Sequence, residues 1–274
     1  MRTLFVSDLD GTLLTRNEKV SPYSLERLNR LIASGVTFTF ATARSLSSAA
    51  SAVEGLFVNA PAILYNGGLI YNYQTKEVVN AVCFDDATKY FVLEELRRHE
   101  INPLVFGANE HEYVSWITGS ETLGIQRYLA RRTNDARLRP VHADSDLMRG
   151  GVFYFKCIGP RAQLERAWNI LKYDSRLMCI FHQETYQSDF WMEISPREAS
   201  KANAVNLLRQ NLGFERVICF GDTSNDSDMF DVCDEKYAVM NADSWLKEKA
   251  TGVIGYCEED GVAKWLESNA LQRL

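Results

Sequence analysis

The segment LFVSDLDGT, residues 4–12, decides the fold of this 274-residue chain. Its first four residues are an apolar run typical of a buried strand, and they lead directly into a loop with two carboxylates. Residues that follow a strand of an open α/β sheet lie at the carboxyl edge of the sheet, where ligands bind. An ordinary Asp/Gly turn has the same letters, so the remaining sequence must decide between a site and a turn.

Strand-like and helix-like segments alternate at both ends of the chain, which is typical of a parallel sheet covered by helices. Amphipathic helices are expected at Ser24–Ala33 and Glu198–Leu212, each with a glycine close behind it. The expected strands are Leu4–Ser7, Thr37–Ala41, Ala62–Tyr65, Val217–Phe220 and Tyr237–Met240.

The middle of the chain has a different order of elements, which indicates a separate α+β insert. We expect this insert at 84–190, with a sheet domain made of 1–83 and 191–274. The turn NGG at 66–68, between two apolar triplets, predicts a hairpin through which the chain leaves the sheet. The elements expected in the insert are helices at Asp86–Glu100 and Arg161–Lys172 and strands at Tyr113–Ile117, Val152–Ile158, Leu177–His182 and Tyr186–Ile194.

A second acidic loop, GDTSND at 221–226, follows the strand expected at Val217–Phe220. If the two loops meet at one edge of the sheet, the carboxylates of Asp8, Asp10, Asp222 and Asp226 repel one another unless a cation neutralises them. Oxygen donors alone favour Mg²⁺. Asp226 could equally cap the helix that follows, and we therefore assign it a supporting role instead of direct ligation.

Two further segments could hold an anion beside these carboxylates. Thr42, Ala43 and Arg44 follow the strand at Thr37–Ala41 and offer a hydroxyl and free backbone N–H groups, although Thr42 could simply cap the next helix. Lys201 lies in the first turn of an expected helix, where the helix dipole disfavours a cation, so a neighbouring anion is expected. The alternative is a solvated surface lysine.

In this order, the four segments resemble the haloacid dehalogenase (HAD) superfamily, and within it the Cof-type phosphatases with a type IIB cap. They are DLDGT at 8–12, TAR at 42–44, Lys201, and GDTSND at 221–226, and the hairpin and the insert lie in the family's places. The resemblance implies an α/β fold with a Rossmann-like parallel sheet core and an inserted α+β cap. The chain has alanine at 43 and 202, where many members have glycine. Ala43 needs a negative φ, so we expect a slightly different loop shape there.

The resemblance also implies the catalytic roles. Asp8 would be the nucleophile that attacks phosphorus and forms an aspartyl-phosphate. Asp10 would be the acid/base that protonates the leaving alkoxide and later activates water. The backbone carbonyl of Asp10, with the carboxylates of Asp8 and Asp222, would bind Mg²⁺.

Five groups would hold the phosphoryl oxygens by the same resemblance, because the transition state spreads negative charge over them. Asp226 would orient Lys201 or the waters on the metal. The phosphate-binding groups would be the amides of Leu9 and Ala43 and the side chains of Thr42, Lys201 and Asn225.

The insert would close over the sheet domain, exclude water and contact the substrate. Each candidate for such contact could instead belong to the surface or core of the cap. The candidates are His182, Gln183, Glu184, Tyr186 and Trp191.

The sequence therefore predicts an Mg²⁺-dependent phosphatase of small phosphorylated metabolites, with sugar phosphates foremost. A phosphomutase shares the same motifs and differs chiefly in keeping water from the aspartyl-phosphate. A signalling module phosphorylated on Asp8 is an alternative from another class, but such a module needs only a sheet domain and no insert.

Composition and sequence pattern indicate which binding partners and which cellular location to expect. The net charge is −6 and no basic run is present, which makes a nucleic acid a poor partner. The longest uncharged stretch, Gly55–Thr75, contains Pro61 and several polar turn residues, so it is not expected to span a membrane. No signal-peptide pattern opens the sequence, and a cytoplasmic location is the default expectation.

Overall fold

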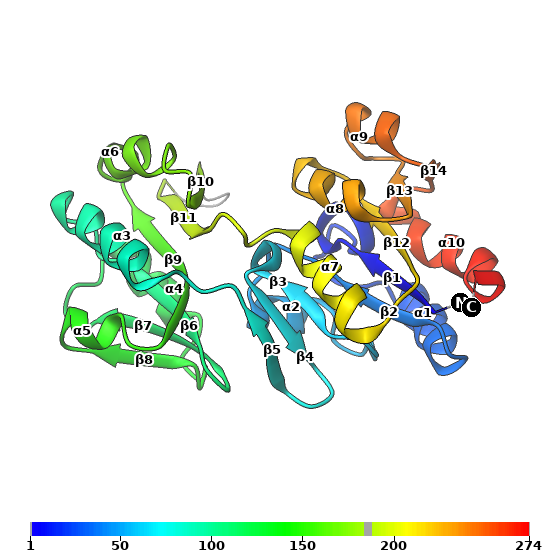
Figure 1. The fold of residues 1–274 in the computed structure, drawn as a ribbon, viewed down its shortest axis with the longest axis horizontal. Helices are drawn as coiled ribbons and strands as arrows, with labels where there is room; N and C mark the ends of the chain where they lie inside the picture. The colour runs from blue at the N-terminus through cyan, green and yellow to red at the C-terminus, as the bar shows by residue number, and fades with distance from the viewer. Residues whose placement is uncertain (1, 184–187, 274) are drawn as a thin grey trace. The chain divides into compact units, whose positions relative to one another are not determined.

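Strand β1 (Thr3–Ser7) lies between two other strands of the parallel sheet, and all five of its residues are buried, as a strand covered on both faces requires. The computed structural model, which describes residues 2–183 and 188–273, places it in a five-stranded sheet of order β14-β13-β12-β1-β2. Every neighbouring pair in this sheet is parallel (Figure 1). The predicted parallel sheet is confirmed.

The remaining strands and helices have the following bounds. No helix within the described residues is long and apolar enough to cross a membrane. The further strands are β2 (Thr37–Phe40), β3 (Ala62–Leu64), β4 (Leu69–Asn72), β5 (Glu77–Ala81), β6 (Leu104–Ala108), β7 (Glu112–Ile117), β8 (Leu138–Val141), β9 (Gly151–Gly159), β10 (Leu177–Gln183), β11 (Phe190–Pro196), β12 (Arg216–Gly221), β13 (Glu235–Val239) and β14 (Gly252–Ile254). The helices are α1 (Pro22–Ala33), α2 (Leu46–Ala52), α3 (Asp86–Arg98), α4 (Leu123–Ala130), α5 (Asp144–Leu147), α6 (Arg161–Leu171), α7 (Lys201–Leu212), α8 (Ser227–Val232), α9 (Ser244–Lys249) and α10 (Gly261–Asn269), with short turns η1 (Leu9–Leu13), η2 (Tyr65–Gly67), η3 (Ser224–Asp226), η4 (Cys257–Glu259) and η5 (Leu271–Arg273).

Helix α7 begins three residues later than the sequence pattern indicates. Ser200 has an extended backbone, and its side chain accepts a hydrogen bond from the amide of Asn203, so it is the N-cap of the helix. Lys201 is consequently the first residue of α7. The helix ends at Gly213, whose φ of 67° lies in the left-handed region that a C-terminal cap uses.

The strand expected at Ala62–Tyr65 does not join the parallel sheet as a full member. Strand β3 is three residues long and meets the end of β2 only through one parallel bridge, between Ala41 and Ile63. It instead belongs to a three-stranded sheet of order β3-β4-β5, in which β3 and β4 are antiparallel. The predicted hairpin at 66–68 is therefore present, and it extends this small sheet.

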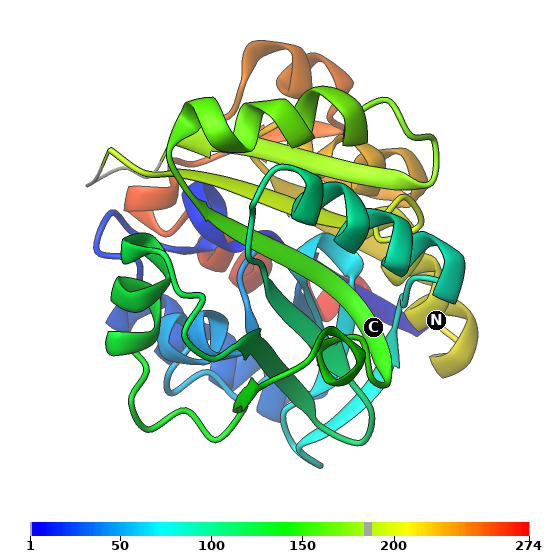
Figure 2. The same cartoon turned by 90° about the vertical axis from the view of Figure 1, so that its left-hand side faces the viewer.

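The chain forms two compact units, one of which holds the described residues up to Asn80 and from Ser200 onward, while the other is Ala81–Ala199. The second unit contains a six-stranded sheet of order β10-β11-β9-β6-β7-β8. Figures 1 and 2 show α3 and α6 on the same side of this sheet, and their apolar residues share one core with β9 and β11. The unit continues past residue 190, the boundary expected from sequence, because β11 pairs with both β9 and β10.

Candidate active site

Three neighbouring strands end at the same edge of the parallel sheet and carry the predicted site residues there. The register aligns Ser7 of β1 with Phe220 of β12 and Phe40 of β2. Asp8 follows directly after β1, and its amide donates to the carbonyl of Phe220 at 2.9 Å. Asp222 follows β12 by one residue, and Thr42 follows β2 by two. The carboxyl edge therefore brings the three motifs together, as expected for an open α/β sheet.

The side chain of Lys201 is completely buried and joins two carboxylates. Its Nζ lies 2.6 Å from Oδ1 of Asp8 and 2.7 Å from Oδ1 of Asp226. Position 201 is thus not a solvated surface lysine. Two charge-assisted hydrogen bonds satisfy an ammonium group that could not otherwise be buried at the start of a helix.

Three carboxylates form a compact group around this lysine. Oxygens of Asp8, Asp222 and Asp226 all lie within 4.8 Å of one another, and all three residues are buried. One lysine balances only one of three negative charges, and the donors are all oxygens, so the group fits a hard divalent cation. Asp10 contributes no side-chain oxygen to it, which is compatible with the predicted use of its backbone carbonyl.

Burial and mutual repulsion shift the ionisation of these groups. Burial raises the pKa of Asp8 to about 8, an effect that Lys201 opposes and Asp226 reinforces. Burial likewise raises the pKa of Asp222 to about 7, and Asp226 adds to the shift. Burial disfavours the charge on Lys201, but Asp8 and Asp226 outweigh it and raise the lysine pKa. An additional cation would therefore favour the ionised carboxylates.

Asp226 does not cap α8 through its side chain, contrary to the alternative considered from sequence. Its Oδ2 accepts hydrogen bonds from the amides of Asp222 and Thr223, at 2.9 and 3.3 Å, and its Oδ1 accepts from Lys201. The carboxylate therefore closes the 221–226 loop onto α7. This geometry suits a supporting role in holding Lys201.

The residues after Asp10 position Asp222, a role that sequence reasoning did not assign. The hydroxyl of Thr12 donates to Oδ1 of Asp222 at 3.3 Å. Gly11 has a φ of 76°, and a Cβ there would lie 2.2 Å from Oδ2 of Asp222. The only sequence signal for this contact is the position of both residues in the DLDGT loop.

The predicted phosphate-binding residues on the 42–44 loop are close to the carboxyl edge but differ in exposure. Thr42 is fully buried, and its hydroxyl accepts from the amide of Arg44 at 3.1 Å. Ser45, not Thr42, caps α2. Ala43 is exposed, and its φ is not positive, as expected for a residue with a side chain.

The remaining phosphate-binding candidates do not contact the carboxylate group through side chains. Asn225 is exposed, and its Oδ1 accepts from the hydroxyl of Thr223 at 2.7 Å. Leu9 is buried, so only its amide could serve the site. The carboxylate of Asp10 is held by Arg44, for which the sequence pattern assigned no role.

The cap candidates that the structure describes lie in the second unit. His182 and Gln183 are exposed on β10, whereas Trp191 on β11 is half-buried, with its ring 4.4 Å from Nζ of Lys156. Lys156 in turn pairs with Glu193 at 3.1 Å. Glu184 and Tyr186 lie outside the described residues.

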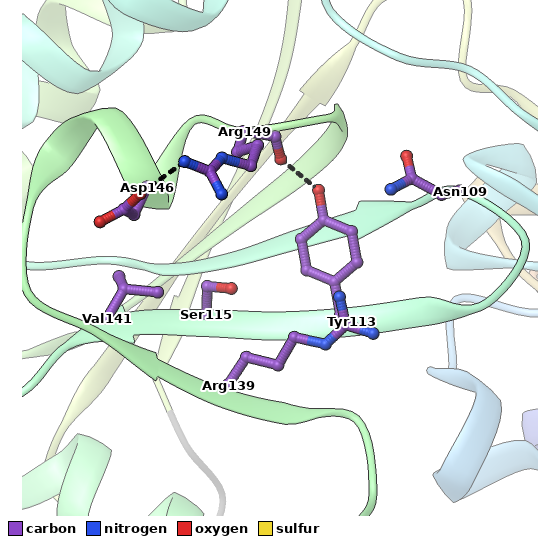
Figure 3. A pocket seen from close by; sticks show the side chains of 7 residues that line it. All are labelled: Asn109, Tyr113, Ser115, Arg139, Val141, Asp146 and Arg149. Atoms are coloured by element: carbon purple, nitrogen blue, oxygen red, sulfur yellow. Dashed lines mark hydrogen bonds and ion pairs between the residues drawn. The ribbon is translucent and has the colours of Figure 1, made fainter.

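A separate pocket of about 260 Å³ in the second unit contains none of the predicted site residues. Figure 3 shows Tyr113 in this pocket, with its hydroxyl donating to the backbone carbonyl of Arg149. The guanidinium of Arg139 lies against the face of the Tyr113 ring. The guanidinium of Arg149 pairs with Asp146 at 3.0 Å.

Comparison with known proteins identifies the class. The family model of haloacid dehalogenase-like hydrolases matches residues 5–266. A 5-amino-6-(5-phospho-D-ribitylamino)uracil phosphatase from Bacillus subtilis (strain 168) is 25% identical over 282 residues, which cover 95% of each chain. The chain is an α/β enzyme of the hydrolase class. It belongs to the haloacid dehalogenase-like hydrolase family, as the four motifs predicted.

Solved structures confirm the predicted fold over the whole length. A haloacid dehalogenase-like hydrolase from Bacteroides thetaiotaomicron has a TM-score of 0.77 at 22% identity, covering 98% of this chain and 99% of that one. A HAD subclass IIB sugar phosphatase has a TM-score of 0.66 at 16% identity, covering 98% of both chains. At these identities the likeness concerns the fold.

Proposed function

We propose that the chain is an Mg²⁺-dependent phosphatase that hydrolyses small phosphorylated metabolites through an aspartyl-phosphate on Asp8. The observation that carries this proposal is the buried bridge of Lys201 between Asp8 and Asp226, next to Asp222. A buried carboxylate held by a fixed cation at the ligand-binding edge of a parallel sheet is suited to act as a nucleophile.

The proposed reaction has two steps. An oxygen of Asp8 attacks phosphorus, the bond to the leaving alkoxide breaks, and Asp10 donates a proton to that oxygen. A water then attacks the aspartyl-phosphate, Asp10 takes its proton, and the bond to Asp8 breaks to release phosphate. Lys201 fixes the side chain of Asp8, which attacks phosphorus in the first step and is released in the second.

The other predicted residues support the phosphoryl group and the cation. Asp8, Asp222 and the Asp10 carbonyl would hold Mg²⁺, which supplies positive charge to the phosphoryl oxygens when bound. We propose that the phosphoryl oxygens receive hydrogen bonds from the groups predicted for this role. These are the amides of Leu9 and Ala43 and the side chains of Thr42, Lys201 and Asn225.

The second unit, in this proposal, is the cap that excludes water and recognises the leaving group, and it corresponds to the insert placed at 84–190. The relative from Bacillus subtilis is named for a small phosphorylated metabolite, and one fold neighbour is described as a sugar phosphatase. These names support small phosphate esters, with sugar phosphates first among them.

A panel of phosphorylated metabolites tests the proposal through release of inorganic phosphate. The wild type should release phosphate, EDTA should stop the release, and Mg²⁺ should restore it. Asp8→Asn should abolish turnover, and Asp10→Asn should lower it by about 10²–10⁴-fold, as for other acid/base groups. Asp231→Asn, which changes a largely exposed carboxylate on α8, is the matched control. Isomerised sugar phosphates without free phosphate would indicate a phosphomutase instead, and full activity of Asp8→Asn would exclude the covalent mechanism.

A further inference from the structure

The guanidinium of Arg44 holds both carboxylate oxygens of Asp10. Its Nε lies 2.8 Å from Oδ2 and its Nη2 lies 2.5 Å from Oδ1, which is the two-point geometry that arginine forms with carboxylates. The side chain of Arg44 is only 14% exposed, whereas that of Asp10 is 53% exposed. The arginine is therefore the fixed partner, and Asp10 would otherwise be free to rotate in solvent.

Contacts other than Asp10 fix Arg44 in turn. Its Nη2 lies 3.0 Å from Oε2 of Glu18, and its Nη1 donates to the hydroxyl of Ser48 at 3.3 Å. Its backbone amide donates to the hydroxyl of Thr42. The guanidinium would thus keep its place even while one contact to Asp10 is exchanged for a substrate oxygen.

Glu18, which contacts Arg44, lies in a tight turn of the backbone. Glu18 has a φ of 55°, a left-handed conformation that is unfavourable for a residue with a side chain. Hydrogen bonds within the 15–19 loop hold it there, from the amide of Glu18 to the carbonyl of Thr15 and from the amide of Thr15 to the carbonyl of Lys19. The loop thereby presents the Glu18 carboxylate to Arg44.

We infer that Arg44 is a positioning residue for Asp10, an inference that rests on the proposed phosphatase reaction. A general acid must lie within hydrogen-bonding distance of the leaving oxygen, and small errors in its position lower the rate strongly. Two contacts fix the location and the plane of the ionised carboxylate, the form that takes a proton from water in the second step. When one oxygen of Asp10 carries the proton for the leaving group, the contact of Arg44 to the other oxygen still holds the side chain in place. Arg44 therefore acts through Asp10.

The dependence of the rate on the leaving group tests this role. A sugar alkoxide needs a proton from Asp10 as it leaves, whereas p-nitrophenolate is stable enough to leave without one. Arg44→Gln should lower kcat/KM for the best sugar phosphate of the panel by about 10–100-fold. It should lower kcat/KM for p-nitrophenyl phosphate by less than about threefold, because kcat/KM covers only the steps through departure of the leaving group.

The ratio of the two kcat/KM values is the readout, since general damage to the site lowers both. Arg44→Lys keeps the charge without the two-point contact and should change the ratio less than Arg44→Gln. In the Asp10→Asn background, Arg44→Gln should have almost no further effect, because the two residues act as one unit. Arg30→Gln is the matched control, since Arg30 pairs with Glu26 on the exposed side of α1.

Two results would overturn the inference: an unchanged ratio in Arg44→Gln, or a full additional loss in the Asp10→Asn background. Either would mean that Arg44 serves the phosphoryl group or the fold and not Asp10. Failure of the proposed function itself looks different. The wild type would then release no phosphate, or Asp10→Asn would fail to change the ratio.

Discussion

Four charged side chains share the buried space at the carboxyl edge of the parallel sheet, and their charges do not balance. Lys201 pairs with Asp8 and Asp226, and Asp222 completes the group with a hydrogen bond from Thr12. Burial raises the pKa of both Asp8 and Asp222, and repulsion from Asp226 adds to the shift. Stability without a metal ion should therefore depend on pH.

The sign of that dependence follows from Asp222. Its pKa is about 7 in the folded chain, against an ordinary value of 3.8, so the folded state binds more protons than the unfolded state between about pH 4 and pH 7. The stability contributed by this proton is fully present below about pH 4 and is lost as the pH rises through 7. Asp222→Asn removes the ionisable group. In EDTA, Tm of the variant minus Tm of the wild type should therefore increase from pH 5 to pH 8, as measured by circular dichroism.

The effect of added Mg²⁺ on Tm tests the same charge balance. The cation binds ionised carboxylates, so it should raise Tm of the wild type more at pH 8 than at pH 5, and should raise Tm of Asp222→Asn less. A Tm difference between the two proteins that stays flat with pH, or decreases, would contradict the assigned charge balance.

At the scale of single residues, the sequence predicted those site residues that come directly after a strand. Asp8 and Asp222 could be placed together because each follows a strand of the same parallel sheet. The contact between Arg44 and Glu18 could not be predicted, since it depends on the left-handed backbone at Glu18. The direction of the Asp226 carboxylate was likewise set by loop geometry that a helix-capping pattern does not contain.

At the scale of elements, the position of Lys201 depends on the turn η2. Gly67 in this turn has a φ of 99°, and a Cβ on it would lie 2.1 Å from the carbonyl oxygen of Ser200. Ser200 is the N-cap of α7, and Lys201 is its first residue. The backbone of the turn therefore sets where α7 begins.

Gly67→Ala should destabilise the protein and displace Lys201 together. We expect the free energy of unfolding to fall by about 2–4 kcal/mol from backbone strain and overpacking. We expect kcat/KM to fall at least about tenfold, because the lysine moves relative to Asp8. Gly35→Ala is the matched control. Gly35 has the same φ of 99°, but a Cβ there meets nothing within 4 Å, so only the strain of about 1–2 kcal/mol should appear and kcat/KM should not change.

Urea unfolding and phosphatase kinetics on the two alanine variants would measure both effects. Equal losses of stability in the two, with unchanged kcat/KM, would show that η2 does not position α7.

Helix and strand types were predictable from hydrophobic periodicity, but the start of α7 and the sheet to which β3 belongs were not. The capping hydrogen bond of Ser200 moves the start of α7 to Lys201, and apolar periodicity carries no information about it. From sequence, β3 has the pattern of a buried strand of the main sheet. In the structure it is short and forms a hairpin with β4, and it therefore belongs to the separate three-stranded sheet.

At the scale of the whole molecule, the second unit has what an independent domain needs. Its six-stranded sheet is complete within Ala81–Ala199, and α3 and α6 cover one face of it. The core beneath these helices includes Leu96, Phe155 and Leu164, all at most 1% exposed. A unit with its own sheet and core of this kind can fold alone.

We therefore predict that a fragment of residues 81–199 folds cooperatively. It should show one thermal transition and a structured near-ultraviolet circular dichroism spectrum, because Trp168 packs on Phe181 within the unit. Leu96→Ala should destabilise the fragment by about 2–5 kcal/mol, as expected for a truncated core leucine. Tyr90→Ala is the control, because Tyr90 is 44% exposed on the same helix and should have a much smaller effect. A fragment without a cooperative transition, or equal effects of the two variants, would show that the core between α3, α6 and the sheet needs the rest of the chain to form.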